Sequence, residues 1–185
     1  MKKITLICLF SFLLIGIMAA CSSEAENEDV LLQQQDELVQ LMRRGTIWDG
    51  LIGVDDGANG YVIVADTLSL KADLEDQLRI EGNPTKLSTI AIVAKNAVND
   101  PADTGYMLIA ADSAGQSIGV FLRLTNSRFY LDNEVMTSTS CKGCATGCNL
   151  EYLNIEGKKV AYCNENGCIY NCTKSETEFA KNDRG

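Results

Sequence analysis

The amino-acid sequence predicts an α+β protein: a small antiparallel sheet with one or two helices, followed by a small cysteine-rich C-terminal subdomain. Three observations predict this class. A capped amphipathic helix is expected after residue 29, strand-like runs joined by short turns fill residues 105–133, and six of the eight cysteines lie between residues 141 and 172. A chain of 185 residues with 46% hydrophobic side chains is long enough for one ordinary domain and a small appendage.

The first expected helix follows Asp29, which can cap it, and ends at Gly45, which can take a left-handed conformation. Its apolar side chains return to one side every three or four residues, and two cations stand where they favour the last turn. These positions are Val30, Leu31, Leu32, Leu38, Val39, Leu41 and Met42, followed by Arg43 and Arg44. The spacing of Leu70, Leu74 and Leu78 indicates a second helix.

Apolar runs of strand type follow the first helix and surround the second. They cover residues 61–65, 88–93, 106–110, 118–124 and 128–131. Turn-forming residues at 112–115 and 125–127 separate the last three runs, so we expect them to form an antiparallel meander. With the helices on one face, this meander gives an α+β domain over residues 30–136.

A change of composition marks the expected boundary with the C-terminal segment, residues 137–185. The stretch Thr137-Ser138-Thr139-Ser140 precedes the cysteines, and from Cys141 onward six basic residues balance six acidic ones. The preceding part therefore carries the acidic excess of the chain.

The overall composition excludes several classes of function. A net charge of -9 argues against a nucleic-acid partner, because phosphate binding needs clustered Lys and Arg. The complete lack of histidine removes Ser-His and Cys-His nucleophile pairs and all imidazole metal ligands. Together with the lack of any recognisable catalytic constellation, this argues against an enzyme, and no catalytic residue is predicted.

Two local motifs imitate functional sites. Residues 111–115, around Ser113, resemble a nucleophile elbow, but that motif needs a strand-turn-helix context and a histidine, so we interpret them as a hairpin turn. Asp55 and Asp56 lie in a glycine-rich stretch that could hold calcium, but the alternating ligands and distal glutamate of an EF-hand are missing. We interpret this stretch as a solvated turn.

The N-terminus has the pattern of an export signal. Lys2 and Lys3 precede an uncharged, mostly apolar run over residues 4–18. This run is shorter than the about 20 residues that a transmembrane helix needs, and it predicts a signal peptide over residues 1–20. The run ends in Met18-Ala19-Ala20-Cys21, which resembles the lipobox of bacterial lipoproteins. The resemblance implies cleavage before Cys21 and acylation of this cysteine, which would anchor the chain to a membrane. The alternative is a plain signal peptide with Cys21 as an ordinary residue.

Residues 21–29 form an expected lipidated acidic tether. They include Glu24, Glu26, Glu28 and Asp29 and no apolar side chain larger than Ala25, so they are expected to stay extended and solvated. The segment is similar to the acidic tethers that route some lipoproteins of Gram-negative bacteria to the outer face of the outer membrane. We therefore expect an outer-membrane or cell-surface location; a mere spacer is the alternative.

The remaining cysteines form one block with two similar halves. Cys141, Cys144 and Cys148 precede a predicted hairpin, and Cys163, Cys168 and Cys172 follow it. If Glu156 lies opposite Val160 in that hairpin, the register favours the pairs Cys148–Cys168 and Cys144–Cys172 and leaves Cys141 to Cys163. Fifteen connectivities exist for six cysteines, so this pairing is one hypothesis among them.

Three kinds of chemistry are open to this block. Structural disulfides are favoured, because the count is even, exported thiols are oxidised and the segment has few large apolar residues of its own. A zinc site of four thiolates or an iron-sulfur cluster is the metal alternative. A redox-active Cys141-Lys142-Gly143-Cys144 is the third. The block also resembles the cysteine-rich C-terminal segments of uncharacterised bacterial lipoproteins, which implies no activity.

Two functions follow as expectations. The first is a membrane-anchored extracytoplasmic lipoprotein that acts as a binding or structural module and needs no cofactor. The second is an envelope-attached metal or thiol-redox protein that uses the six C-terminal cysteines. The membrane is the partner that the sequence indicates, and it specifies no protein or glycan ligand.

Overall fold

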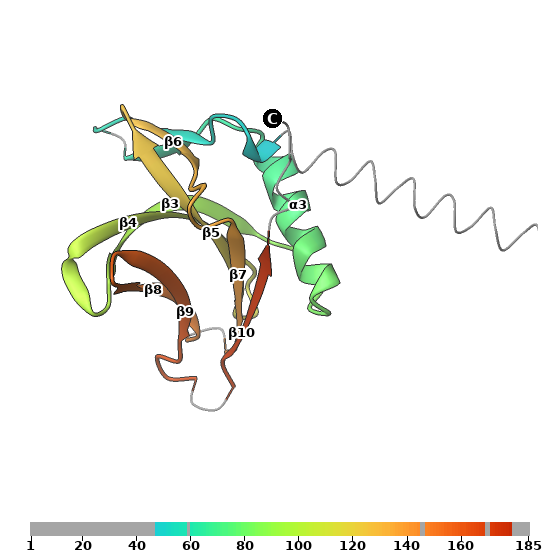
Figure 1. Cartoon of the computed structure of the whole chain (residues 1–185). Helices are drawn as coiled ribbons and strands as arrows, with labels where there is room; N and C mark the ends of the chain where they lie inside the picture. Colours follow the sequence, from blue (N-terminus) through green and yellow to red (C-terminus); the bar gives the residue numbers. More distant parts are fainter. Residues whose placement is uncertain (1–46, 59, 145–146, 169–170, 179–185) are drawn as a thin grey trace, which may run out of the picture. The chain divides into compact units, whose positions relative to one another are not determined.

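The computed structural model describes residues 47–58, 60–144, 147–168 and 171–178 (Figure 1). The predicted signal peptide, Cys21, the acidic tether and the first helix lie outside these residues. The described part is mostly β: strands account for 53% of it and helix for 13%. The predicted α+β class is therefore wrong, and the sheet is much larger than expected, forming a nearly closed antiparallel barrel.

The described elements comprise ten strands and the helix α3. In chain order they are β1 (Gly53–Asp55), β2 (Tyr61–Ile63), α3 (Thr67–Ile80), β3 (Thr89–Ala97), β4 (Asp100–Ala111), β5 (Gln116–Thr125), β6 (Arg128–Leu131), β7 (Thr137–Lys142), β8 (Asn149–Ile155), β9 (Lys158–Asn164) and β10 (Thr173–Glu178). The expected helix around Leu74 and the expected meander of β4, β5 and β6 are confirmed.

The sheet branches at β5. One edge of β5 pairs with β4, which continues to β3. Its other edge is shared, because Gln116–Val120 pairs with β7 and Leu122–Thr125 pairs with β6. Between these two sections, the Asp132 N–H donates to the Phe121 carbonyl oxygen at 3.0 Å. The backbone of β5 is therefore used along both edges.

The β6 branch nearly closes the barrel, and the β7 branch leaves it. From β6 the sheet continues through β1 to β2, and β2 lies beside β3 (Figure 1). On the other branch, β7 pairs along its whole length with β10. Residues 137–140, where the sequence predicts a boundary, thus form a strand within the main sheet.

The first core fills the space between the barrel and α3. Asp66 caps α3, since its carboxylate accepts the Leu68 N–H at 3.0 Å. Leu70, Leu74 and Leu78 are fully buried on one side of the helix. They join a cluster that also contains Trp48, Ile52, Leu87, Ile92, Leu108, Ala110, Ile118, Val120, Leu122, Phe129 and Leu131.

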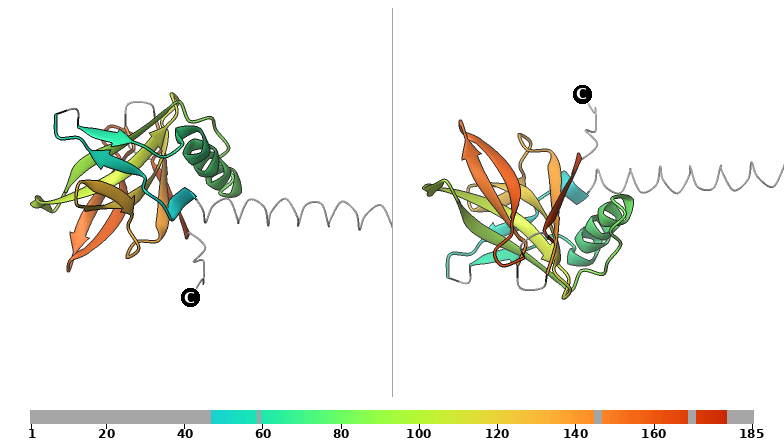
Figure 2. Two further views of the ribbon diagram at one scale, coloured as in Figure 1. Left: turned by 90° about the horizontal axis from the view of Figure 1, so that it is seen from above. Right: turned by 90° about the horizontal axis from the view of Figure 1, so that it is seen from below.

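The hairpin of β8 and β9 lies over the opposite face of β4 and β5 (Figure 2). A second core fills the space between the hairpin and these strands. Side chains alternate along these strands, so Leu108 faces the first core whereas Met107 and Phe121 face the second. Gly119 leaves room for the hairpin, because a Cβ there would lie 2.5 Å from Leu150 Cδ2. The central strands are consequently buried on both faces.

Candidate functional site

Three disulfides join all six cysteines of the C-terminal block. The pairs are Cys141–Cys163, Cys144–Cys168 and Cys148–Cys172, separated by 22, 24 and 24 residues along the chain. The expectation of structural disulfides is confirmed. Cys141, Cys148 and Cys168 are buried, with exposed fractions of 0%, 2% and 3%, as part of the second core. The bridges therefore supply core packing as well as cross-links.

The expected pairing is right for one bridge and wrong for two. Cys141–Cys163 is confirmed, whereas the expected Cys148–Cys168 and Cys144–Cys172 are replaced by Cys144–Cys168 and Cys148–Cys172. The first reason is the hairpin register. The turn consists of Glu156 and Gly157, both with positive φ, so Leu153 and not Glu156 lies opposite Val160.

The second reason is β10, a strand that was not predicted from the sequence. Thr173 at its start pairs with Lys142 at the end of β7. This pairing carries the adjacent Cys172 back to the main sheet, where it reaches Cys148. A signal for β10 exists in the sequence, because Thr173, Ser175 and Thr177 alternate with charged residues at the period of a strand.

The bridges fasten the open end of the β8–β9 hairpin to the sheet. Cys141 on β7 bonds to Cys163 on β9, and the other two bridges join the loop before β8 to the segment between β9 and β10. Two glycines allow this crowding. A Cβ at Gly143 would lie 2.4 Å from Cys148 Cβ, and one at Gly147 would lie 2.8 Å from the Glu165 carbonyl oxygen.

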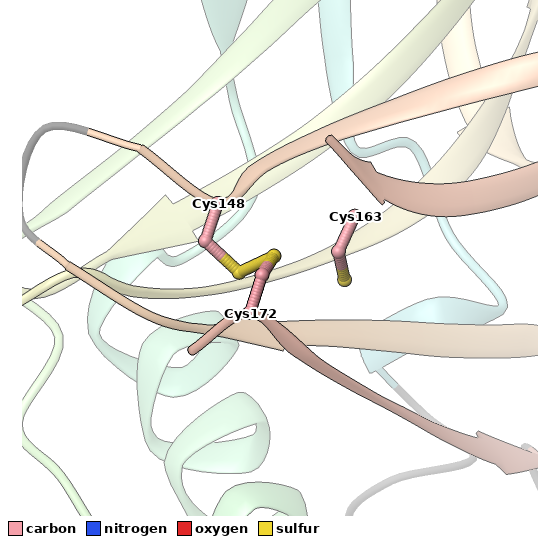
Figure 3. Close-up of side chains that lie close together, drawn as sticks. All are labelled: Cys148, Cys163 and Cys172. Carbon is pink, nitrogen blue, oxygen red and sulfur yellow. A yellow bond between two sulfur atoms is a disulfide. The ribbon is translucent and has the colours of Figure 1, made fainter. Parts of the chain in front are cut away.

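Three sulfur atoms from two different bridges form one cluster. The Sγ atoms of Cys148, Cys163 and Cys172 all lie within 4.8 Å of one another. Figure 3 shows the Cys148–Cys172 disulfide with the sulfur of Cys163 beside it. A thiolate, not a disulfide sulfur, is the effective ligand of zinc or an iron-sulfur cluster, so metal binding here requires reduction of these bridges.

The pair Cys141-x-x-Cys144, which was the redox-active alternative, is not formed. Each of these cysteines is bonded to a partner beyond the hairpin, Cys163 and Cys168 respectively. Cys141 is also fully buried, whereas the attacked sulfur of a redox-active pair must be reached by its substrate.

The two motifs that imitate functional sites are turns. Residues 112–115 connect β4 to β5, and the Asp112 carboxylate accepts the N–H groups of Ala114 and Gln116 at 2.8 and 2.9 Å. Burial raises the pKa of Asp112, but these bonds and one from the Thr85 hydroxyl outweigh it and hold the pKa below its usual value. At the other motif, Asp55 accepts the Gly57 N–H at 2.9 Å.

A partly buried polar seam joins α3 to the strands β7 and β10, and it was not predicted from the sequence. The Ser138 hydroxyl donates to Gln77 Oε1, and Gln77 Nε2 donates to Asp73 at 3.0 Å. One turn further, Glu81 accepts the hydroxyls of Ser140 at 2.5 Å and Thr177 at 2.6 Å. Ser138, Thr139 and Ser140 are 0%, 2% and 3% exposed, so the Ser/Thr run is buried except for the half-buried Thr137.

The described chain is thus a nearly closed antiparallel barrel with a disulfide-fastened hairpin. Comparison with protein-family models, curated proteins and solved structures finds no match. Among the described helices, none has the length and apolar character needed to cross a membrane.

Proposed function

We propose that this protein is a membrane-anchored extracytoplasmic lipoprotein that acts as a binding or structural module. The observation that carries the proposal is the full oxidation of the six C-terminal cysteines to three disulfides. Such bridges form and persist in oxidising compartments outside the cytoplasm. The lipobox-like sequence ending at Cys21 supplies both the export route and the anchor.

In this proposal each segment has a separate task. Acyl chains on Cys21 hold the protein to the outer membrane or cell surface, and the acidic residues 22–29 space the body away from the lipid. The barrel forms the displayed body. The disulfides stabilise it by restricting the conformations of the unfolded chain, and each bridge contributes about 2–4 kcal/mol to the free energy of unfolding.

The mass of the intact protein extracted from membranes tests the anchor and the bridges together. We expect a chain that begins at Cys21, carries acyl groups on this residue, and gains two hydrogens per bridge on reduction. Unmodified Cys21 in the mature chain would contradict the anchor. Free C-terminal thiols, or stoichiometric zinc or iron, would instead support the metal or redox alternative.

Two variants separate anchoring from display. Cys21→Ser should release the protein from membrane fractions while leaving its disulfides intact. Replacing Glu24, Glu26 and Glu28 by Gln should keep the acyl groups but reduce protease accessibility on intact cells, if the acidic tether directs surface display. Unchanged accessibility would mean that the segment is only a spacer.

A further inference from the structure

We propose that Cys148, Cys163 and Cys172 form a thiol–disulfide exchange site that accepts a monothiol. The site differs from the Cys141-x-x-Cys144 pair, because its three sulfurs come from two bridges that meet in space. The proposal goes beyond the anchored module and does not depend on lipidation of Cys21. Its substrate class is a small thiol or an exposed cysteine of another protein.

The geometry places an intact bridge beside a third sulfur. Cys148 and Cys172 are bonded to each other, and Cys163 Sγ lies within 4.8 Å of both sulfurs (Figure 3). Cys163 Sγ also lies 3.5 Å from the Ser140 carbonyl oxygen and 3.7 Å from that of Thr173, so it is held between β7 and β10. When the Cys148–Cys172 bond opens, rotation of the Cys148 side chain therefore brings its thiolate to the sulfur of Cys163 in the neighbouring bridge.

Burial selects which of the two sulfurs in the Cys148–Cys172 bridge the incoming thiol attacks. Cys172 is half-buried, whereas its partner Cys148 is 2% exposed. The incoming thiolate therefore attacks Cys172 Sγ, a mixed disulfide forms between the two, and the Cys148–Cys172 bond breaks. The electron pair of that bond leaves with Cys148, which becomes a thiolate inside the cluster.

The second step transfers the exchange to the neighbouring bridge. The Cys148 thiolate attacks Cys163 Sγ, a Cys148–Cys163 bond forms, and the Cys141–Cys163 bond breaks. Cys141 leaves as the thiolate. One thiol enters and one thiol is released, so the number of disulfide bonds is unchanged once the mixed disulfide on Cys172 is counted.

Cys144–Cys168 stays outside the relay and keeps the segment closed. Neither of its sulfurs belongs to the cluster of three among the described residues. The exchange therefore moves a free thiol from the surface to Cys141, which is fully buried in the second core. Reaction of the buried thiolate back along the same path expels the incoming thiol, so the device is reversible.

Mapping of a single exchange tests the proposal on the full oxidised chain. The folded protein is treated with glutathione, and acid then stops the exchange. The chain is unfolded in acidic guanidinium so that N-ethylmaleimide reaches the buried thiols, and linked peptides are identified by mass spectrometry. We expect glutathione on Cys172, N-ethylmaleimide on Cys141 and a Cys148–Cys163 cross-link. Glutathione on Cys163 with Cys148–Cys172 intact, or N-ethylmaleimide on Cys148 with Cys141–Cys163 intact, would overturn the relay.

Two matched double variants locate the acceptor bridge. Cys141→Ser with Cys163→Ser removes the acceptor and should shift N-ethylmaleimide labelling to Cys148. Cys144→Ser with Cys168→Ser removes the outside bridge and should leave the wild-type pattern. Equal patterns in the two variants would contradict the assignment, and the wild-type map decides the matter if either variant fails to fold.

Discussion

The hydroxyl group of Tyr152 in the second core is influenced by burial, by a hydrogen bond and by a nearby charge. Its side chain is fully buried, packs edge-on against Phe121 with ring centroids 5.6 Å apart, and covers Gly105. Its hydroxyl donates to the Asp103 carbonyl oxygen at 2.8 Å. Burial, followed by the nearby Asp103 charge, raises the pKa of Tyr152 to about 12.

We expect Tyr152→Phe to change how stability depends on alkaline pH. Below pH ~10 the protonated hydroxyl is present in both states, and its loss should cost about 1 kcal/mol of unfolding free energy. Above pH ~10 only the unfolded tyrosine ionises, so the wild type loses this stabilisation as pH rises toward the folded pKa of about 12. Urea unfolding of both proteins at several pH values measures the difference.

The control is Tyr130→Phe on β6, which removes a tyrosine hydroxyl outside the second core. Parallel loss of stability in the wild type and in Tyr152→Phe above pH ~10 would contradict the role given to the buried hydroxyl.

The contact of α3 with β7 shows how a polar sequence can form an internal element. The sequence of residues 137–140 predicts a linker, because their side chains are small and carry hydroxyl groups. In the fold, the backbone of β7 pairs with β5 on one edge and with β10 on the other. Two hydroxyls of β7 donate hydrogen bonds to the side chains of Gln77 and Glu81. A polar strand is stable here because each buried donor and acceptor has a partner.

We expect Ser138→Ala to destabilise the fold by about 1–3 kcal/mol, because Gln77 Oε1 then loses its buried donor. The double variant Ser138→Ala with Gln77→Met should recover much of that loss, since it removes both polar partners. Thermal unfolding of the four proteins in this cycle gives the coupling. Additive effects of the two substitutions would show that the pair is not coupled.

At the scale of the whole molecule, the two cores share β4 and β5. Leu108 and Val120 face α3, whereas Met107 and Phe121 on the same strands face the hairpin. The hairpin is also bonded to β7 through Cys141–Cys163. Loss of either core exposes one face of the same strands, so the described part is expected to unfold as a unit.

We therefore expect one cooperative transition in denaturant for the oxidised protein. Fluorescence of Trp48, which is 4% exposed in the first core, should change together with hydrogen-exchange protection of the amides in β8 and β9. Independent opening of the hairpin at lower denaturant would contradict this and would favour a separate C-terminal subdomain.

The elements that could be predicted are those in which apolar side chains repeat at the spacing of a helix or a strand. Leu70, Leu74 and Leu78 indicate α3, and the alternating or continuous apolar runs of β4 and β5 indicate the meander. β1 has three residues, and β10 has no large apolar side chain, so neither has a local signal strong enough to reveal its pairing. The fold class was wrong because these weak strands complete the sheet.

The sequence by itself determined the clustering of six cysteines, an even set suited to disulfides, and the strands and helix with strong local patterns. It also predicts the anchor at Cys21, which lies outside the described residues. Only the tertiary structure decided the cysteine partners, the sulfur cluster and the burial of the Ser/Thr strand. These depend on the hairpin register and on β10 returning to β7, and pairing between distant segments is set by packing of the whole sheet rather than by spacing along the chain.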